Sequence, residues 1–190
     1  SNPLRIIPMS FLIRKKGTSA CAQITLVLAI CVFVTLNAFS QGRSIKWAPQ
    51  GSAYYKVEKS EIVQYSMPEN TGKVIITKQQ LTPPDATAPL KISFFSFSAD
   101  QQKMLIFTNT QKVWRLNTRG AFWVLDLKAG TLKQLGKTLP PSSLMFAKFS
   151  PDGLSAAYVS GNNLYGENLA ASMSKPLTTN GSVTLINGTF

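Results

Sequence analysis

The stretch FSPDG, residues Phe149–Gly153, is the third copy of a short phrase that recurs along this chain. The first copy is WAPQG at Trp47–Gly51, and the second, FSADQ at Phe97–Gln101, begins 50 residues later. The third begins 52 residues after the second. In each copy an aromatic residue leads a turn, and an apolar run follows it. A period of about 50 residues built from such segments is typical of β-propeller blades.

The segments between these turns are rich in β-branched and aromatic residues, so they predict strands. The predicted units cover 45–82, 90–139 and 143–180, and residues 182–190 begin a fourth. The predicted strands lie near 53–58, 61–67 and 73–78, then 91–97, 103–108, 121–127 and 131–135, then 144–149, 155–159, 163–168 and 175–178. The fold class is therefore all-β, with about three four-stranded blades of an incomplete propeller in residues 41–190 and little helix.

The first forty residues predict a signal helix. Arg14, Lys15 and Lys16 precede an apolar run at 24–36, and small residues at 38 and 40 suit cleavage before Gln41. Met9 could be the true start, with 1–8 as upstream translated residues. The run is shorter than the roughly 20 residues of a membrane span. We therefore expect an exported protein, periplasmic or extracellular, with a membrane anchor as the less favoured alternative.

Composition limits the chemistry of these 190 residues. They contain no His, so a Ser-His-Asp triad cannot form within them, and no Gly-x-Ser-x-Gly motif occurs. Both cysteines, Cys21 and Cys31, lie in the signal segment. We expect no metal site, no cofactor and no catalysis by these residues alone. Residues 41–190 carry 16 basic and 8 acidic side chains, but the basic ones are dispersed, so nucleic acid is not an expected partner.

Several ordered motifs carry a family resemblance. They are FSADQ at 97–101, Val113-Trp114-Arg115, VLDL at 124–127, FSPDG at 149–153 and NLY at 163–165. Together they resemble the N-terminal β-propeller of the dipeptidyl peptidase IV family, whose members are prolyl oligopeptidase-like serine exopeptidases. The resemblance extends over roughly Ile45–Phe190 and is densest between residues 96 and 165. It implies a propeller that gates access to an α/β-hydrolase domain and helps to bind the N-terminus of peptide substrates.

The resemblance also implies a site residue and partners. The Arg of the family's Trp-Arg motif corresponds to Arg115, which would bind a carbonyl or carboxylate oxygen of the substrate. The family's acidic pair follows a segment like Asn187–Phe190, so neither the pair nor the nucleophile lies in these residues. The implied partners are peptides, the hydrolase domain and the remaining blades, and a homodimer of the full-length protein is also conceivable. The segment after Trp114-Arg115 (LNTRG, 116–120) departs from the family by lacking aromatic and Ser character.

Simpler interpretations stand beside these. Arg115 could be an ordinary surface residue paired with an acid or stacked on Trp114. Asp100, Asp152 and Asp126 are expected to accept hydrogen bonds from turn backbone rather than to form a carboxylate pair. The phrase-leading aromatics Trp47, Phe97 and Phe149 are expected in blade packing, and core or blade-to-blade contacts are expected of Tyr54, Tyr65, Phe107, Trp123, Tyr158 and Tyr165. For the whole protein, the alternative function is a non-enzymatic periplasmic propeller that serves as a protein-binding or scaffold module.

Overall fold

A computed structural model describes residues 45–113 and 115–188. This part of the chain contains strands and no α-helix, which confirms the all-β prediction. The signal helix predicted in residues 1–40 lies outside the described residues. The strands are β1 (Lys46–Trp47), β2 (Ala53–Glu58), β3 (Glu61–Ser66), β4 (Thr71–Ile76), β5 (Phe94–Phe97), β6 (Lys103–Val113), β7 (Leu116–Asp126), β8 (Leu132–Gln134), β9 (Leu144–Phe149), β10 (Ser155–Ser160), β11 (Asn163–Asn168) and β12 (Met173–Pro176).

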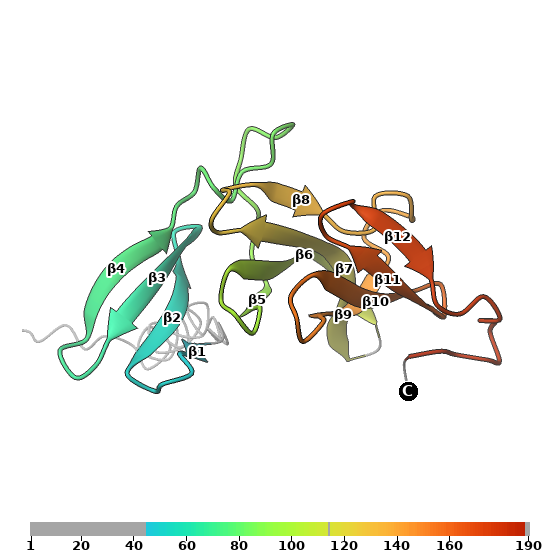
Figure 1. The fold of residues 1–190 in the computed structure, drawn as a ribbon, viewed down its shortest axis with the longest axis horizontal. Helices are drawn as coiled ribbons and strands as arrows, with labels where there is room; N and C mark the ends of the chain where they lie inside the picture. Colours follow the sequence, from blue (N-terminus) through green and yellow to red (C-terminus); the bar gives the residue numbers. More distant parts are fainter. Residues whose placement is uncertain (1–44, 114, 189–190) are drawn as a thin grey trace, which may run out of the picture. The chain divides into compact units, whose positions relative to one another are not determined.

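The strands form three sets of four, which we call blade 1 (β1–β4), blade 2 (β5–β8) and blade 3 (β9–β12). Within each blade, consecutive strands pair antiparallel, as Figure 1 shows. Blade 1 is a separate sheet, whereas blades 2 and 3 are joined because β7 also pairs with β9. This joint was not expected from the sequence, which predicted β7 to begin only at residue 121.

The recurring phrase folds into the same turn three times. In each copy the fifth residue donates its backbone N–H to the carbonyl of the second residue at 2.9 Å. The fifth residues, Gly51, Gln101 and Gly153, all have positive φ, at 71°, 56° and 67°. Glycine adopts this conformation without a Cβ penalty, which explains its place in two of the three copies. The repeat seen in the sequence is therefore a structural repeat.

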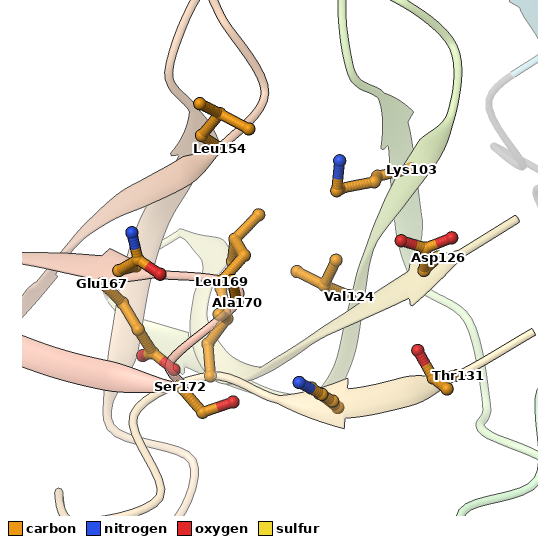
Figure 2. A pocket seen from close by; sticks show the side chains of 12 residues that line it. Lys103, Val124, Asp126, Thr131, Leu154, Glu167, Leu169, Ala170 and Ser172 are labelled. Atoms are coloured by element: carbon orange, nitrogen blue, oxygen red, sulfur yellow. The ribbon is translucent and has the colours of Figure 1, made fainter. Parts of the chain in front are cut away.

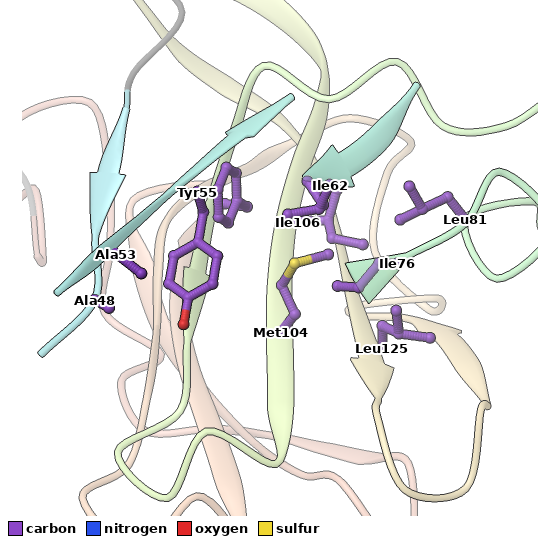
Figure 3. Packing of buried hydrophobic residues seen from close by; sticks show 10 residues of the cluster. Ala48, Ala53, Tyr55, Ile62, Ile76, Leu81, Met104, Ile106 and Leu125 are labelled. Carbon is purple, nitrogen blue, oxygen red and sulfur yellow. The ribbon is translucent and has the colours of Figure 1, made fainter. Parts of the chain in front are cut away.

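Strand β6 shows how the blades stack, because both of its faces are buried. Met104 and Ile106 face a cluster shared with blade 1, which includes Tyr55 and Ile62 (Figure 3). The alternate residues Leu105 and Phe107 face a second cluster, which includes Phe122 from blade 2 and Ala156 and Tyr158 from blade 3. Successive side chains of a strand point to opposite faces. Blade 2 is therefore packed on both sides.

The aromatic residues that lead the turns do not all pack alike. Phe97 contacts Tyr55 of blade 1 with ring centroids 4.9 Å apart, and Phe149 packs against the cluster between blades 2 and 3. Trp47 is 59% exposed and meets Tyr54 only edge-on, with centroids 5.6 Å apart. The prediction of blade packing is thus wrong for Trp47. Its counterparts each contact the preceding blade, and blade 1 has no preceding blade among the described residues.

The strand predicted to begin a fourth unit is absent from residues 182–188. This segment bends back on itself, and the Ser182 N–H donates to the Leu185 carbonyl at 2.8 Å. The first strand of a blade is held by hydrogen bonds to the second strand, and no second strand for this unit lies among residues 45–113 and 115–188. Residues 189–190, the remainder of the prediction, lie outside the described part.

Candidate functional site

Arg115 lies at the tip of a long β-hairpin formed by β6 and β7. Val113 and Leu116 are the last cross-strand pair, and Arg115 lies in the turn between them. Arg115 is exposed there, and nothing is described of Trp114. The sequence predicted a connection at this point, but it predicted the flanking strands to end at 108 and to resume at 121. The structure instead carries the ladder outward through residues 109–113 and 116–120.

A bulge lies where the hairpin passes beyond the regular blade. The register of β6 and β7 shifts between Thr108 and Gln111, and Asn109 has a positive φ of 49°. Gly120 lies opposite this bulge, and a Cβ placed on it would lie 2.6 Å from the Thr108 carbonyl oxygen and 2.6 Å from Phe107 Cε2. Bulges bend a strand and increase its twist. Only glycine at position 120 therefore allows β7 to approach the backbone of β6 this closely. The bulge at this point bends the hairpin that carries Arg115.

The base of this hairpin is held by the next blade. Arg119 pairs with Met145 and Gly120 pairs with Leu144, so the extended part of β7 is hydrogen-bonded into β9. Strand β7 is thus paired on both sides, with β6 along the hairpin and with β9 of blade 3 at its base. These two pairings fix the direction of the hairpin. A binding residue carried on such a rigid support is positioned more accurately than one on a free loop.

Arg115 has no ion pair with a carboxylate of the part of the chain that the structure describes. The ion pair found in the described residues joins Lys56 and Glu58 at 2.7 Å. No carboxylate of residues 45–113 or 115–188 lies within 4.0 Å of the Arg115 guanidinium. This weakens the interpretation of Arg115 as half of a surface ion pair. A guanidinium presents a planar set of donors that can hold a carboxylate or carbonyl oxygen in fixed geometry.

A cavity of about 290 Å³ lies near the base of the hairpin, at the same ends of the strands as Arg115. Arg119 contributes to its wall, together with Ser143 and Ser160, whose hydroxyl oxygens are 2.8 Å apart, and with Tyr165. Sequence reasoning did not identify Arg119. Arg119 reaches this wall through the pairing of β7 with β9, which no local sequence pattern indicates.

A larger cavity, of about 430 Å³, lies between blades 2 and 3 at the opposite ends of the strands (Figure 2). Lys103 and Asp126 of blade 2 lie across it from Glu167 and Leu169 of blade 3. Sequence reasoning missed this site as well. Its charged residues on blade 2 lie 34 to 64 residues before Glu167 of blade 3, and only the packing of the two blades brings them to one cavity.

Glu167 is a buried carboxylate, 4% exposed. Its Oε2 atom accepts hydrogen bonds from the backbone N–H of Gly136 at 2.8 Å and from the Tyr158 hydroxyl at 2.7 Å. The Tyr158 oxygen also lies 2.8 Å from the Ser174 hydroxyl. Burial raises the pKa of Tyr158 well above its ordinary value, so the phenol stays protonated and can donate to Glu167.

The three aspartates behave as the turn residues that the sequence predicted. Asp100 Oδ1 accepts from the Ser98 hydroxyl at 2.5 Å and from the Gln102 N–H at 3.1 Å. Asp152 makes the equivalent bonds in the next blade, and Asp126 accepts from two backbone N–H groups of its own turn at 3.0 and 2.8 Å. The serine hydroxyl and then the backbone N–H lower the carboxyl pKa of both Asp100 and Asp152. These contacts account for all three carboxylates structurally.

Within 45–113 and 115–188, no group of three or more His, Cys, Asp or Glu side chains is arranged to hold a metal ion. No helix in that part of the chain has the length and apolar character needed to cross a bilayer.

Comparison with known proteins places this geometry in context. Residues 98–190 match the family model described as the dipeptidyl peptidase IV (DPP IV) N-terminal region. A probable dipeptidyl-aminopeptidase B from Arthroderma otae is 31% identical over 91 residues, which is 48% of this chain and 10% of that protein. The Aspergillus oryzae protein of the same name is 27% identical over 118 residues, or 62% of this chain and 13% of that protein.

A solved structure is similar in fold. The crystal structure of Porphyromonas gingivalis dipeptidyl peptidase 4 superposes with a TM-score of 0.67 at 22% sequence identity, covering 80% of this chain and 21% of that one. At this identity the likeness concerns the fold, and it agrees with the propeller blades described above. The matched stretch spans only about a tenth of the length of the curated relatives.

Proposed function

Because residues 98–190 belong to the N-terminal region of the dipeptidyl peptidase IV family, we propose that this chain is the substrate-access propeller of a serine-type dipeptidyl peptidase. In this proposal the blades restrict access to a catalytic domain elsewhere in the protein. The observation that supports it most is the position of Arg115, which is exposed at the tip of the β6–β7 hairpin. Strand β7 of this hairpin pairs with β6 and, at its base, with β9.

The proposed role of Arg115 is to hold an oxygen of the bound peptide. Its guanidinium would donate to a substrate carbonyl or carboxylate and so fix the peptide N-terminus relative to the catalytic domain. Hydrogen bonds to a charged partner contribute about 1.5–3 kcal/mol, which corresponds to roughly 10- to 150-fold in an equilibrium or rate constant.

Kinetics of the full-length protein test this role. We expect Arg115→Ala to lower kcat/KM for release of dipeptides ending in Pro or Ala by roughly 10- to 100-fold, and Arg115→Lys to recover part of the loss. Lys112→Ala is the matched control, because Lys112 is an exposed cation on the same hairpin. If Arg115→Ala and Lys112→Ala gave the same kcat/KM as the unaltered enzyme, the proposed role would be wrong.

We also propose that the protein is exported. The basic residues 14–16, the uncharged run at 24–36 and the small residues before Gln41 support a cleavable signal peptide. N-terminal sequencing of protein recovered from outside the cytoplasm should give Gln41 as the first residue. An intact leader on protein confined to the cytoplasm would contradict this proposal.

A further inference from the structure

The larger cavity, between blades 2 and 3, is independent of the Arg115 site. Its lining residues belong to β6, β7, β8 and β11 and to the turns next to these strands and before β10, so all of the described residues that line it come from blades 2 and 3. It lies at the ends of β6 and β7 opposite to the hairpin that carries Arg115, because Lys103 begins β6 and Asp126 ends β7. Its volume, about 430 Å³, is in the range of small-molecule sites.

A carboxylate with unused acceptor capacity lines this cavity. Gly136 and Tyr158 both donate their hydrogen bonds to the Oε2 atom of Glu167. No residue in the described part of the chain donates to its Oε1 atom. A carboxylate that is 4% exposed loses most of its hydration. Glu167 is thus held in place through one oxygen while the other can accept from a cation.

Two ammonium groups line the same cavity. Lys103 and Lys133 come from β6 and β8 of blade 2, whereas Glu167 comes from blade 3, and Figure 2 shows Lys103 and Glu167 on different sides. Within the described residues neither lysine has a carboxylate within 4.0 Å. The blade 3 wall therefore carries the Glu167 carboxylate. The blade 2 wall carries two ammonium groups and the Asp126 carboxylate, whose Oδ1 atom accepts from the backbone N–H groups of its own turn.

We propose that this cavity binds a small zwitterion of the α-amino acid class. Its ammonium would donate to Glu167, its carboxylate would accept from Lys103 or Lys133, and an aliphatic side chain would contact Leu154 and Leu169, which also line the cavity. A ligand that carries both charges can pair with Glu167 and with a lysine at once, whereas a simple cation or a simple anion pairs with only one of them. Binding here does not depend on Arg115 or on peptidase activity.

Titration calorimetry of the protein with L-leucine as the probe tests this site. Leucinamide, which lacks the carboxylate, and N-acetyl-leucine, which lacks the ammonium, are the matched analogues. We expect saturable binding of leucine and at least tenfold weaker binding of each analogue. Absence of saturable leucine binding, or equal affinity for the three compounds, would overturn the proposal.

Single substitutions then locate the site. Lys103→Gln, Lys133→Gln and Glu167→Gln should each weaken leucine binding, with the largest loss in Glu167→Gln. Lys175→Gln should bind as the unaltered protein does, because Lys175 is exposed on β12 and does not line the cavity. If Glu167→Gln does not fold, the two lysine variants still decide, since unchanged leucine affinity in both would refute the assignment.

Discussion

The backbone N–H of Gly136 donates a hydrogen bond of 2.8 Å to the Oε2 atom of Glu167, 31 residues further along the chain. Gly136 follows β8, where the chain leaves blade 2, and Glu167 lies in β11 of blade 3. The bond joins two blades that otherwise meet through apolar side chains and the short β7–β9 ladder. One buried carboxylate therefore helps to fix how blades 2 and 3 pack.

Removal of this carboxylate should weaken the packing of the two blades. Glu167→Ala leaves the Gly136 N–H without its acceptor and removes the hydrogen bond that Tyr158 donates to Oε2. We expect a loss of about 2–3 kcal/mol in the free energy of unfolding, measured by urea denaturation. Glu167→Gln keeps an acceptor oxygen and should lose less. Equal stability of Glu167→Ala and the unaltered protein would mean that the bond contributes nothing net.

The bulge opposite Gly120 makes a second prediction. Gly120→Ala places a Cβ 2.6 Å from the Thr108 carbonyl oxygen, which is backbone, and should cost about 1–3 kcal/mol of stability through overpacking. Gly166→Ala is the matched control, since Gly166 is also in a strand but its Cβ would make only ordinary contacts of 3.6–3.8 Å with Leu177. Chemical denaturation of both variants gives the comparison, and a Gly120→Ala variant as stable as Gly166→Ala would contradict the geometry described.

The two aspartate turns predict a pH dependence below neutrality. The carboxyl pKa values of Asp100 and Asp152 are lowered in the folded state by the hydroxyls of Ser98 and Ser150. Their stabilising effect is therefore fully present above the unfolded value near 3.8 and is lost as the pH falls through the lower folded value.

Urea denaturation midpoints at pH 6, 4 and 3 measure this effect. The double variant Asp100→Asn/Asp152→Asn should lose less stability between pH 6 and pH 3 than the unaltered protein does. Asp85→Asn serves as the control, because Asp85 lies in the exposed Pro-rich linker outside these turns. Parallel pH curves for the double variant and the control would argue against the predicted linkage.

Arg115 is expected to matter for binding and not for folding. Its side chain is exposed and has no ion pair with a described carboxylate, so Arg115→Ala should change the free energy of unfolding by no more than about 0.5 kcal/mol. The same denaturation assay checks this. A large loss of stability would indicate that Arg115 holds the hairpin together, and any kinetic defect would then have a structural cause.

Local sequence patterns were sufficient to predict the blades. The phrase that begins at residues 47, 97 and 149 marks the turn between the first and second strands of each blade. The predictions 53–58, 144–149 and 163–168 coincide with β2, β9 and β11. These features depend on neighbouring residues, which is why one sequence reveals them. The two-residue strand β1 was not predicted, because so short a strand exists only by pairing with β2.

The candidate sites were less predictable. The sequence identified Arg115 through a motif, but it did not indicate that β6 and β7 extend past a bulge to carry it, because that extension depends on pairing between β7 and β9. Glu167 is an isolated acid in its own segment. Its hydrogen bonds to Gly136 and Tyr158 and its place in a charged cavity arise only when two blades pack together.

The nucleotide sequence that follows the Phe190 codon tests the central claim most directly. If these residues are the access propeller of a dipeptidyl peptidase, the reading frame should continue into an acidic pair within about ten codons, then further blades and a Gly-x-Ser-x-Gly motif. Further blades that end in a stop codon without that motif would contradict the peptidase proposal. That result would favour a propeller that only binds other proteins.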